Sequence, residues 1–336
     1  MRGLGVNLLV SLITLILCVL VLEGGFRLAG VHPERPVNPI FSWKAQGELW
    51  RMEPGATWRT RVGDRLVRIN ADGLRDREIG PCRSDVFRIL LLGDSVTFGH
   101  GQPIEATLGR ELERVLSSDE RTVEVINAGV PGWSTRQQRL FYEEDGVRLC
   151  PDLVLVGFVL NDVTELQRGV IEIGVDRGLA VTGAITWLAE RTATVAGLKG
   201  LYATYFDPAR REIGVVKNLV HRADAPEVRH AMELVERELT LLRDLAAERA
   251  DAFGLVLFPF RFQLLAEGLD APQAELTRFA QEQGIPVLDT LPVLRTHPPA
   301  SVLMDHDHFT ARGHRIVAQT IAAWLRRVSP LGVPAG

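Results

Sequence analysis

The sequence predicts an α/β protein built on a parallel sheet that helices cover on both faces. Three observations carry this prediction. Short apolar runs without polar alternation recur along the chain, as expected for strands buried on both faces. Helical patterns separate these runs, so strands and helices alternate in order. Gly, Asp, Ser or Asn follow several runs, where the carboxyl ends of parallel strands would share one edge.

The alternation begins near residue 87, within an expected main domain at residues 81–330. The runs expected to form strands are Phe87–Leu92, Thr122–Ile126, Asp152–Val159, Gly254–Pro259 and Ile285–Leu288. The helical patterns lie at Ile104–Leu116, Thr135–Val147, Pro226–Arg249, Pro272–Gln283 and Thr310–Arg327. Residues 164–219 do not fit the alternation. We expect them to be an insertion, either helical and over the site or a patch near the membrane.

Length and charge limit the class of protein. A chain of 336 residues is long enough to bury a large core in one or two domains. The net charge is −4, and no basic block interleaved with aromatic residues is present. The composition therefore argues against nucleic acid as a partner.

Residues 1–30 are expected to form a membrane anchor and its flank. No charged residue occurs from Gly3 to Leu22, and this length matches a helix that crosses a bilayer. Arg2 precedes the stretch, whereas Glu23 and Arg27 cancel after it. The positive-inside rule then favours a cytoplasmic N-terminus and an exported remainder.

Contact with the lipid bilayer is expected through residues 4–22. The alternative is a signal peptide cleaved near Leu28–Gly30, which would release a secreted protein. The apolar stretch is long for a signal peptide, and we therefore favour the uncleaved anchor. Cys18 follows Leu17 rather than a small residue, so we do not interpret it as a lipidation site.

Residues 31–80 read as a polar connector. Alternation within Thr57–Ile69 predicts short strands, and Asn70–Gly73 is a turn signal. We interpret Arg75 as a surface residue that pairs with Asp72 or Asp76 rather than as a part of any catalytic site.

The strand at Phe87–Leu92 ends at Gly93, Asp94 and Ser95. Gly93 permits a sharp turn without a Cβ clash, and Ser95 would lie at the ligand-binding edge of the sheet. An ordinary strand-to-helix turn would use the same residue types.

The ends of other strands supply the remaining groups that a serine nucleophile needs. His308 is the candidate base, and Asp305, three residues earlier, is the candidate carboxylate that orients its imidazole. The backbone N–H groups of Ser95 and Gly132 and the side-chain amide of Asn161 are candidate donors to an oxyanion. These assignments predict a catalytic triad and an oxyanion hole.

These residues resemble the sequence blocks of the SGNH (GDSL-type) hydrolases. Gly93–Val96 matches the serine block, and Asn127–Gly132 matches the block whose glycine donates to the oxyanion. By its spacing from Asn127, that role falls to Gly132 rather than Gly129. Asn161–Asp162 matches the third block, and Asp305–His308 matches the Asp-x-x-His block. The resemblance covers about residues 87–325.

The resemblance implies a flavodoxin-like three-layer sandwich with about five parallel strands. It also implies ester hydrolysis through an acyl-serine intermediate, without a metal or another cofactor. The substrate would be a small-molecule ester or an acylated glycan, and O-acyl or O-acetyl groups on carbohydrate are expected. The Gly-x-Ser-x-Gly elbow of the general α/β hydrolases is absent around Ser95.

Two positions depart from the family pattern. Val159 stands where glycine is usual, which we expect to narrow the pocket, and Phe309 stands where proline is frequent after the histidine. With Asn70–Arg75, the second departure resembles a membrane-anchored bacterial subgroup linked to cell-envelope carbohydrate. That resemblance implies a single-pass protein of the bacterial inner membrane with a periplasmic catalytic domain.

Three alternatives stay open. The chain could be an O-acyltransferase acting on cell-envelope polysaccharide, or a carbohydrate-binding scaffold without activity. His306, Asp307 and His308 could be metal ligands, although no further ligand cluster completes such a site. We expect His314 to be structural rather than catalytic.

Two cysteines lead to a separate hypothesis. Cys82 precedes the first strand of the sheet and Cys150 precedes the third, and these strands are neighbours in the flavodoxin-like order. We therefore hypothesise a Cys82–Cys150 disulfide at the edge opposite the site, which an oxidising periplasm would permit. The alternative is two free buried thiols.

Overall fold

A computed structural model describes residues 2–31, 41–43, 49–59, 66–118, 122–168, 185, 187–189, 191–206, 216–249 and 251–328. The chain forms two compact units. One combines residues 1–38 with residues 171–212, and the other combines residues 39–170 with residues 213–336. Parts of the predicted connector (residues 32–40, 44–48 and 60–65) and insertion (residues 169–184, 186, 190 and 207–215) lie outside the described residues.

The larger unit is built on a parallel sheet of five strands. The strands lie in the order β6-β5-β7-β8-β9, which is the flavodoxin-like order that the resemblance implies. Every residue of β5 and β7 is buried, so the runs without alternation are covered on both faces. The strands are β5 (Val86–Gly93), β6 (Thr122–Gly129), β7 (Leu153–Val159), β8 (Ala252–Phe258) and β9 (Val287–Asp289).

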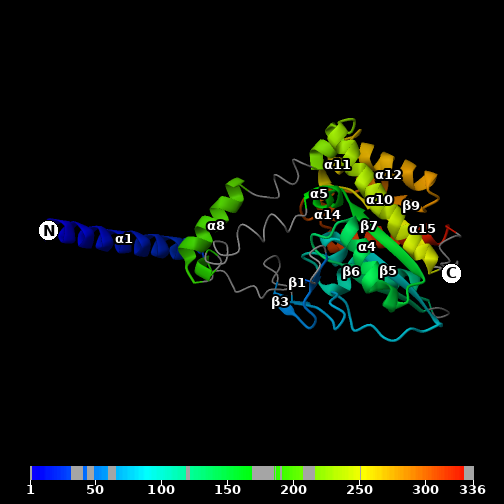
Figure 1. Ribbon diagram of the computed structural model, residues 1–336, viewed down its shortest axis with the longest axis horizontal. Helices are drawn as coiled ribbons and strands as arrows, with labels where there is room; N and C mark the ends of the chain where they lie inside the picture. Colours follow the sequence, from blue (N-terminus) through cyan, green and yellow to red (C-terminus); the bar gives the residue numbers. More distant parts are fainter. Residues whose placement is uncertain are drawn as a thin grey trace. The chain divides into compact units, whose positions relative to one another are not determined.

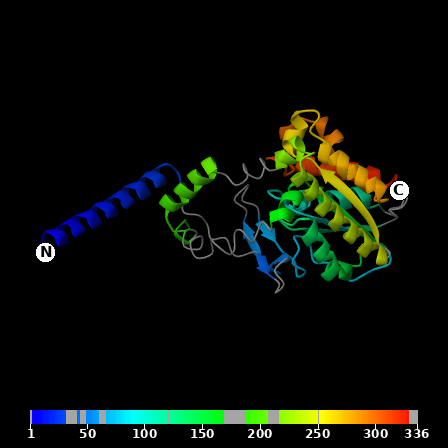
Figure 2. The same cartoon turned by 45° about the horizontal axis from the view of Figure 1, so that its top comes forward.

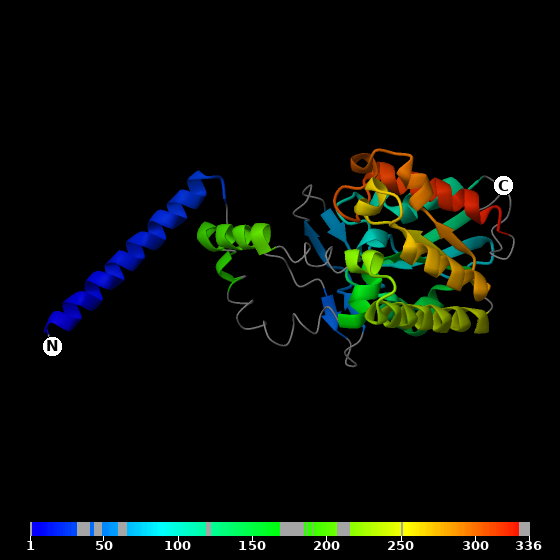
Figure 3. The ribbon, with the colours of Figure 1, turned by 90° about the horizontal axis from the view of Figure 1, so that it is seen from above.

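Helices cover both faces of this sheet (Figures 1 and 3). On one face, α10 packs against α4 and α5, and Arg243 of α10 donates to the carbonyl of Gln283 after α12. On the other face, α15 packs against α3. The helices are α3 (Leu108–Leu116), α4 (Thr135–Glu144), α5 (Asn161–Arg168), α10 (Pro226–Glu248), α12 (Ala271–Glu282) and α15 (Ala311–Leu325). The three-layer sandwich predicted from the sequence is confirmed.

Short helical turns join the main elements. They are α2 (Ser95–Phe98), η1 (Ile104–Ala106), η2 (Gly146–Leu149), α11 (Arg261–Leu265), α13 (Leu291–Arg295) and α14 (Pro299–Val302). The predicted helix at Ile104–Leu116 is therefore two pieces. Thr107 between them is extended (φ −75°, ψ 159°) and its hydroxyl donates to the carbonyl of Ile104, which closes the first turn before α3 begins.

The connector forms two antiparallel pairs of short strands. β1 (Phe41–Trp43) pairs with β2 (Trp50–Met52), and β3 (Thr57–Arg59) pairs with β4 (Leu66–Arg68). The indole N–H of Trp133 donates to the carbonyl of Trp50 at 3.0 Å. This bond fixes the connector against the loop that follows β6.

The smaller unit holds α1 (Arg2–Leu28) and α8 (Ala193–Phe206). The predicted apolar stretch lies inside α1, and an 18-residue window within Gly5–Leu28 has a mean hydropathy of 2.8. By length and composition, this helix is the one candidate membrane span among the described residues. The helix continues past Leu22, where the uncharged stretch ends.

Candidate active site

Ser95 lies where β5 ends at the carboxyl edge of the sheet. The Asp94 side chain accepts the N–H of Val96 at 2.9 Å and caps the short helix α2, which begins at Ser95. A Cβ on Gly93 would overlap the side chain of Thr97, so glycine is required for this turn. As the first residue of α2, Ser95 has a backbone N–H without an intrahelical acceptor.

His308 and Asp305 lie on the loop between α14 and α15. The Nε2 atom of His308 is 2.9 Å from the Ser95 hydroxyl, and its Nδ1 atom is 2.8 Å from Oδ2 of Asp305. The other carboxylate oxygen of Asp305 accepts the N–H of His308 at 2.9 Å. Because a carboxylate only accepts, Nδ1 carries a proton, and in the neutral ring Nε2 is left to accept the serine hydroxyl. The structure brings these three predicted residues together.

Asp307 places a second carboxylate beside the same imidazole. Its Oδ1 atom lies 3.1 Å from Nδ1 of His308 and 3.3 Å from Nε2 of His306. Asp307 is buried, whereas the side chain of Asp305 is 38% exposed. Asp307 was expected from the sequence only as a possible metal ligand, because a second Asp inside Asp-x-x-His has no distinguishing pattern.

These charges set the protonation of the pair. Burial alone would lower the pKa of His308, but the Asp305 hydrogen bond and the Asp307 and Asp305 charges outweigh it and raise the pKa to about 9. Burial would raise the pKa of Asp305, but the hydrogen bonds and charge of His308 instead lower that pKa well below its usual range. The imidazole is therefore a stronger base than free histidine.

The candidate oxyanion donors lie on neighbouring strand ends. Gly132 has a φ of +81°, a conformation that favours glycine. No acceptor is recorded for its backbone N–H among the described residues. The N–H of Gly129 is already bonded to the Asn127 side chain at 3.0 Å. This difference is consistent with the assignment of the donor role to Gly132.

Asn161 is the first residue of α5 and is buried. Its amide nitrogen donates to Oδ2 of Asp94 at 3.0 Å. This bond orients the amide group beside the residue that follows β5. Burial raises the pKa of Asp94, and burial with the nearby Asp94 charge raises the pKa of Asp162 well above its usual range.

The interpretation of Arg75 as a surface residue is wrong. Arg75 is buried, and its guanidinium donates to the carbonyls of Phe98, Gly99 and Gln102 at 2.9, 2.7 and 2.5 Å. These carbonyls belong to the chain that leaves α2. Arg75 therefore fixes the segment that carries His100, whose ring lies 4.6 Å from the ring of His308. Backbone carbonyls leave no trace in a sequence, so no pattern could have indicated this partner.

Asp305, His306 and Asp307 also form a group whose potential ligand atoms lie within 4.8 Å of one another. Both carboxylates of this group lie within 3.1 Å of His308 Nδ1. The imidazole therefore accounts for their arrangement. His314 is buried against Phe309, and burial lowers its pKa to about 3, which fits the structural role expected from the sequence.

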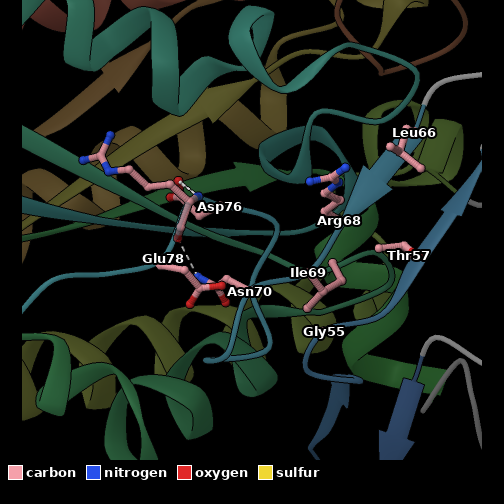
Figure 4. A pocket seen from close by; sticks show the side chains of 9 residues that line it. Gly55, Thr57, Leu66, Arg68, Ile69, Asn70, Asp76 and Glu78 are labelled. Carbon is pink, nitrogen blue, oxygen red and sulfur yellow. Dashed lines mark hydrogen bonds between the residues drawn. The ribbon is translucent and has the colours of Figure 1, made fainter.

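A cavity of about 410 Å³ lies away from these residues, beside β3, β4 and the segment that follows β4 (Figure 4). None of its lining residues is a predicted site residue; they are Gly55, Thr57, Leu66, Arg68, Ile69, Asn70, Asp76, Arg77 and Glu78. The Asn70 amide donates to the Arg77 carbonyl and its oxygen accepts the N–H groups of Asp72 and Leu74. Asn70 therefore shapes the turn.

Several solved structures are similar to the chain at low sequence identity. The chain is similar to a putative lipolytic protein of the G-D-S-L family from Desulfitobacterium hafniense (14% identity, 71% of this chain, 99% of that chain, TM-score 0.43). It is similar to an acetylxylan esterase from Geobacillus stearothermophilus (17% identity, 71% of this chain, 94% of that chain, TM-score 0.44). A two-domain esterase active on acetylated mannans is also similar (17% identity, 72% of this chain, 49% of that chain, TM-score 0.45).

No curated protein sequence matches the chain. A family model, described as the GDSL-like Lipase/Acylhydrolase family, matches residues 91–316. The matched range is about two thirds of the chain and runs from the strand before Ser95 to the helix after His308. On this match, the chain belongs to the GDSL-like lipase/acylhydrolase family.

Proposed function

We propose that the protein is a serine esterase in which Ser95 is the nucleophile, His308 the general base and Asp305 the residue that orients the imidazole. The observation that carries this proposal is the continuous relay from the Ser95 hydroxyl through both ring nitrogens of His308 to Asp305. A serine hydroxyl needs such a base within hydrogen-bond distance. The family to which the chain belongs contains lipases and acylhydrolases.

Acyl transfer to the enzyme follows from this relay. The Ser95 oxygen bonds to the acyl carbon while its proton passes to Nε2 of His308. The N–H groups of Ser95 and Gly132 and the Asn161 amide stabilise the oxyanion. His308 then returns the proton to the alcohol oxygen as the ester C–O bond breaks.

Water completes the cycle in a hydrolase. Its oxygen bonds to the acyl carbon as one of its protons passes to His308. The bond to Ser95 then breaks, His308 returns the proton to the serine oxygen, and the carboxylic acid leaves. The Ser95 hydroxyl and Nε2 of His308 lie within hydrogen-bond distance, and Asp305 keeps Nδ1 protonated throughout.

The substrate that we propose is a short O-acyl group, such as acetyl, on a carbohydrate of the cell envelope. His100, Gln102 and His306 are partly exposed polar residues around the candidate site, and such side chains bind hydroxyl groups better than alkyl chains. Val159 stands where the family pattern has glycine, and we propose that its side chain narrows the acyl pocket and favours a small acyl group. The second candidate is transfer of the acyl group to a polysaccharide hydroxyl instead of water.

Turnover assays separate these functions. The full chain should release acetate from p-nitrophenyl acetate and from acetylated oligosaccharides, and Ser95→Ala and His308→Ala should abolish release. An acyltransferase would instead form an acylated product that increases when a carbohydrate acceptor is added. A folded wild-type protein that neither hydrolyses nor transfers any of these esters would contradict the proposal and favour a carbohydrate-binding scaffold.

We further propose that α1 is an uncleaved anchor that holds the catalytic unit on the periplasmic face of the bacterial inner membrane. Glu23 accepts hydrogen bonds from the first residues of α8, and Phe26 packs against Gly197. Cleavage near Leu28–Gly30 would remove both contacts. The membrane-bound protein should therefore retain its N-terminus in intact mass spectrometry, whereas a mass that begins near residue 30 would contradict the anchor.

A further inference from the structure

The helix α8 is apolar but too short to cross a bilayer. Its 14 residues, ATVAGLKGLYATYF, contain one charged side chain. At 1.5 Å per residue the helix is about 21 Å long, whereas a spanning helix needs about 30 Å. A helix that is apolar on all sides is normally buried in a protein core or in lipid.

The start of α8 is attached to the end of the apolar stretch of α1. The Glu23 carboxylate accepts the backbone N–H groups of Ala193 and Thr194 at 3.0 and 2.9 Å and the Thr194 hydroxyl at 2.8 Å. The carboxylate therefore caps α8 and binds donors that the helix itself leaves unpaired.

Small residues bring the two helices into contact. Ala193, Ala196 and Gly197 of α8 are buried, and a Cβ on Gly197 would overlap the ring of Phe26. The views in Figures 1 and 2 agree that α8 lies beside the C-terminal end of α1. The face of α8 that holds these small residues is thus covered by α1.

Several large apolar side chains in the described part of this unit are exposed. On α8, Leu198 is 54% exposed and Leu201 is 47% exposed. In the segment that precedes α8, Ile185 and Leu188 are also exposed, and Trp187 is 54% exposed with the Arg191 guanidinium 4.3 Å from its ring. Tryptophan and arginine are side chains suited to the boundary between lipid and water.

The contact with Glu23 sets the depth of these side chains relative to a bilayer. Glu23 is the first charged residue after the apolar stretch Gly3–Leu22, whose length of about 30 Å matches the hydrocarbon core. An anchor placed in this way has Glu23 at the headgroup boundary. Because α8 begins at Glu23, its exposed leucines would start at the same level.

We propose that α8 and the exposed residues just before it form an interfacial element that lies in the headgroup region of the membrane spanned by α1. The ligand is the lipid bilayer, contacted by Trp187, Leu188, Leu198 and Leu201. This inference rests on the proposed anchor, and it assigns the α8 part of the sequence insertion to membrane contact. Burial of these side chains in the interface adds to the anchoring by α1.

Site-specific fluorescence quenching in the full chain tests the inference. Single cysteines are introduced at Leu198 and Leu201 in a Cys18→Ser background, since Cys18 is the free cysteine and the other two form a disulfide. Each is labelled with an environment-sensitive fluorophore and reconstituted into phosphatidylethanolamine–phosphatidylglycerol vesicles. Nitroxides near the headgroup or near the bilayer centre act as quenchers. Leu265, which is a 68% exposed leucine of the catalytic unit, is the matched control, and Leu15 reports on the anchor.

Quenching by the shallow nitroxide at residues 198 and 201 should exceed that at residue 265 by about twofold or more, with blue-shifted emission. Quenching at Leu15 by the deep nitroxide, together with values at 198 and 201 equal to that at 265, would overturn the interfacial element and leave the anchor intact. No quenching at Leu15 would overturn both. Spontaneous cross-linking between copies at residue 201 without lipid quenching would place a second copy on this face and also overturn the inference.

Discussion

The two edges of the sheet differ in how they hold buried charge. At the amino edge, the Arg88 guanidinium makes four hydrogen bonds, to Glu124 and to the carbonyls of Leu149, Gly80 and Pro81. At the carboxyl edge, burial and the charge of Asp94 raise the pKa of Asp162, and the imidazole of His308 faces two carboxylates.

The amino edge also carries a disulfide. Cys82 and Cys150 are joined next to the amino edge, with their Cα atoms 5.9 Å apart, and the hypothesis drawn from the sequence is confirmed. The strands that follow them, β5 and β7, pair directly. The amino edge therefore carries paired, cross-linked groups that stabilise the fold, whereas the carboxyl edge keeps groups with perturbed pKa values, of the kind that catalysis uses.

The largest effect should follow a change at the carboxyl edge. Asp305→Asn should lower kcat/KM by about 10³- to 10⁴-fold without a large loss of stability, because Nδ1 of His308 loses the acceptor that fixes its tautomer. Steady-state kinetics with p-nitrophenyl acetate, alongside thermal unfolding, would measure both quantities. If Asp305→Asn keeps activity within tenfold of wild type and Asp307→Asn loses most of it, then Asp307 rather than Asp305 orients the imidazole of His308.

A change at the amino edge should lower the stability of the fold and leave catalytic activity almost unchanged. Replacing Cys82 and Cys150 together by serine should lower the free energy of unfolding by about 4 kcal/mol, given the 68-residue separation. Because the bridge lies near the opposite edge from Ser95, kcat/KM of the folded double variant should stay within about twofold of wild type. Denaturant unfolding of oxidised wild type and the double variant gives the comparison. A catalytic loss in the still-folded variant would mean that the two edges are coupled.

A smaller catalytic effect is expected at Asn161. Asn161→Ala should lower kcat by about 10²- to 10³-fold, since one oxyanion donor is lost. The change also removes the hydrogen bond to Asp94, so it should lower the stability of the fold as well. Asn161→Ala is therefore expected to affect both activity and stability, unlike the two changes above. The stability is measured by thermal unfolding. A kcat close to that of wild type would remove Asn161 from the oxyanion hole.

The smallest effect is a shift in pH dependence. His308 acts as a base only when it is neutral, and its raised pKa of about 9 predicts that kcat/KM rises with pH and levels off near that value. Asp307→Asn removes a charge that favours the protonated ring, so the plateau should be reached at lower pH and activity near neutrality should increase, by up to about tenfold per unit of pKa. A profile identical to that of wild type would mean that Asp307 does not act on His308.

The residues predicted for the carboxyl edge lie at strand ends because the topology of the sheet gathers them there. Ser95, Gly132 and Asn161 each follow a strand of the same parallel sheet, and strand order is readable from apolar runs and helical spacing. The Asp305–His308 pair was readable because a three-residue spacing lets the carboxylate reach the ring. The disulfide hypothesis followed from the same strand order.

The contacts that the sequence did not reveal are made to backbone or across distant loops. Arg75 binds three carbonyls, and backbone carbonyls are present at every residue. Asp307 depends on how one loop folds around His308. The contact of α8 with α1 was also not predicted from the sequence, because an apolar helix pattern does not identify the partner of the helix.

Mass spectrometry of the protein after reaction with a fluorophosphonate probe tests the central claim most directly. We expect one adduct per chain, mapped to Ser95, that forms faster at pH 9 than at pH 6 and is absent in Ser95→Ala and His308→Ala. A correctly folded wild-type protein that stays unlabelled, or an adduct on another residue, would contradict it.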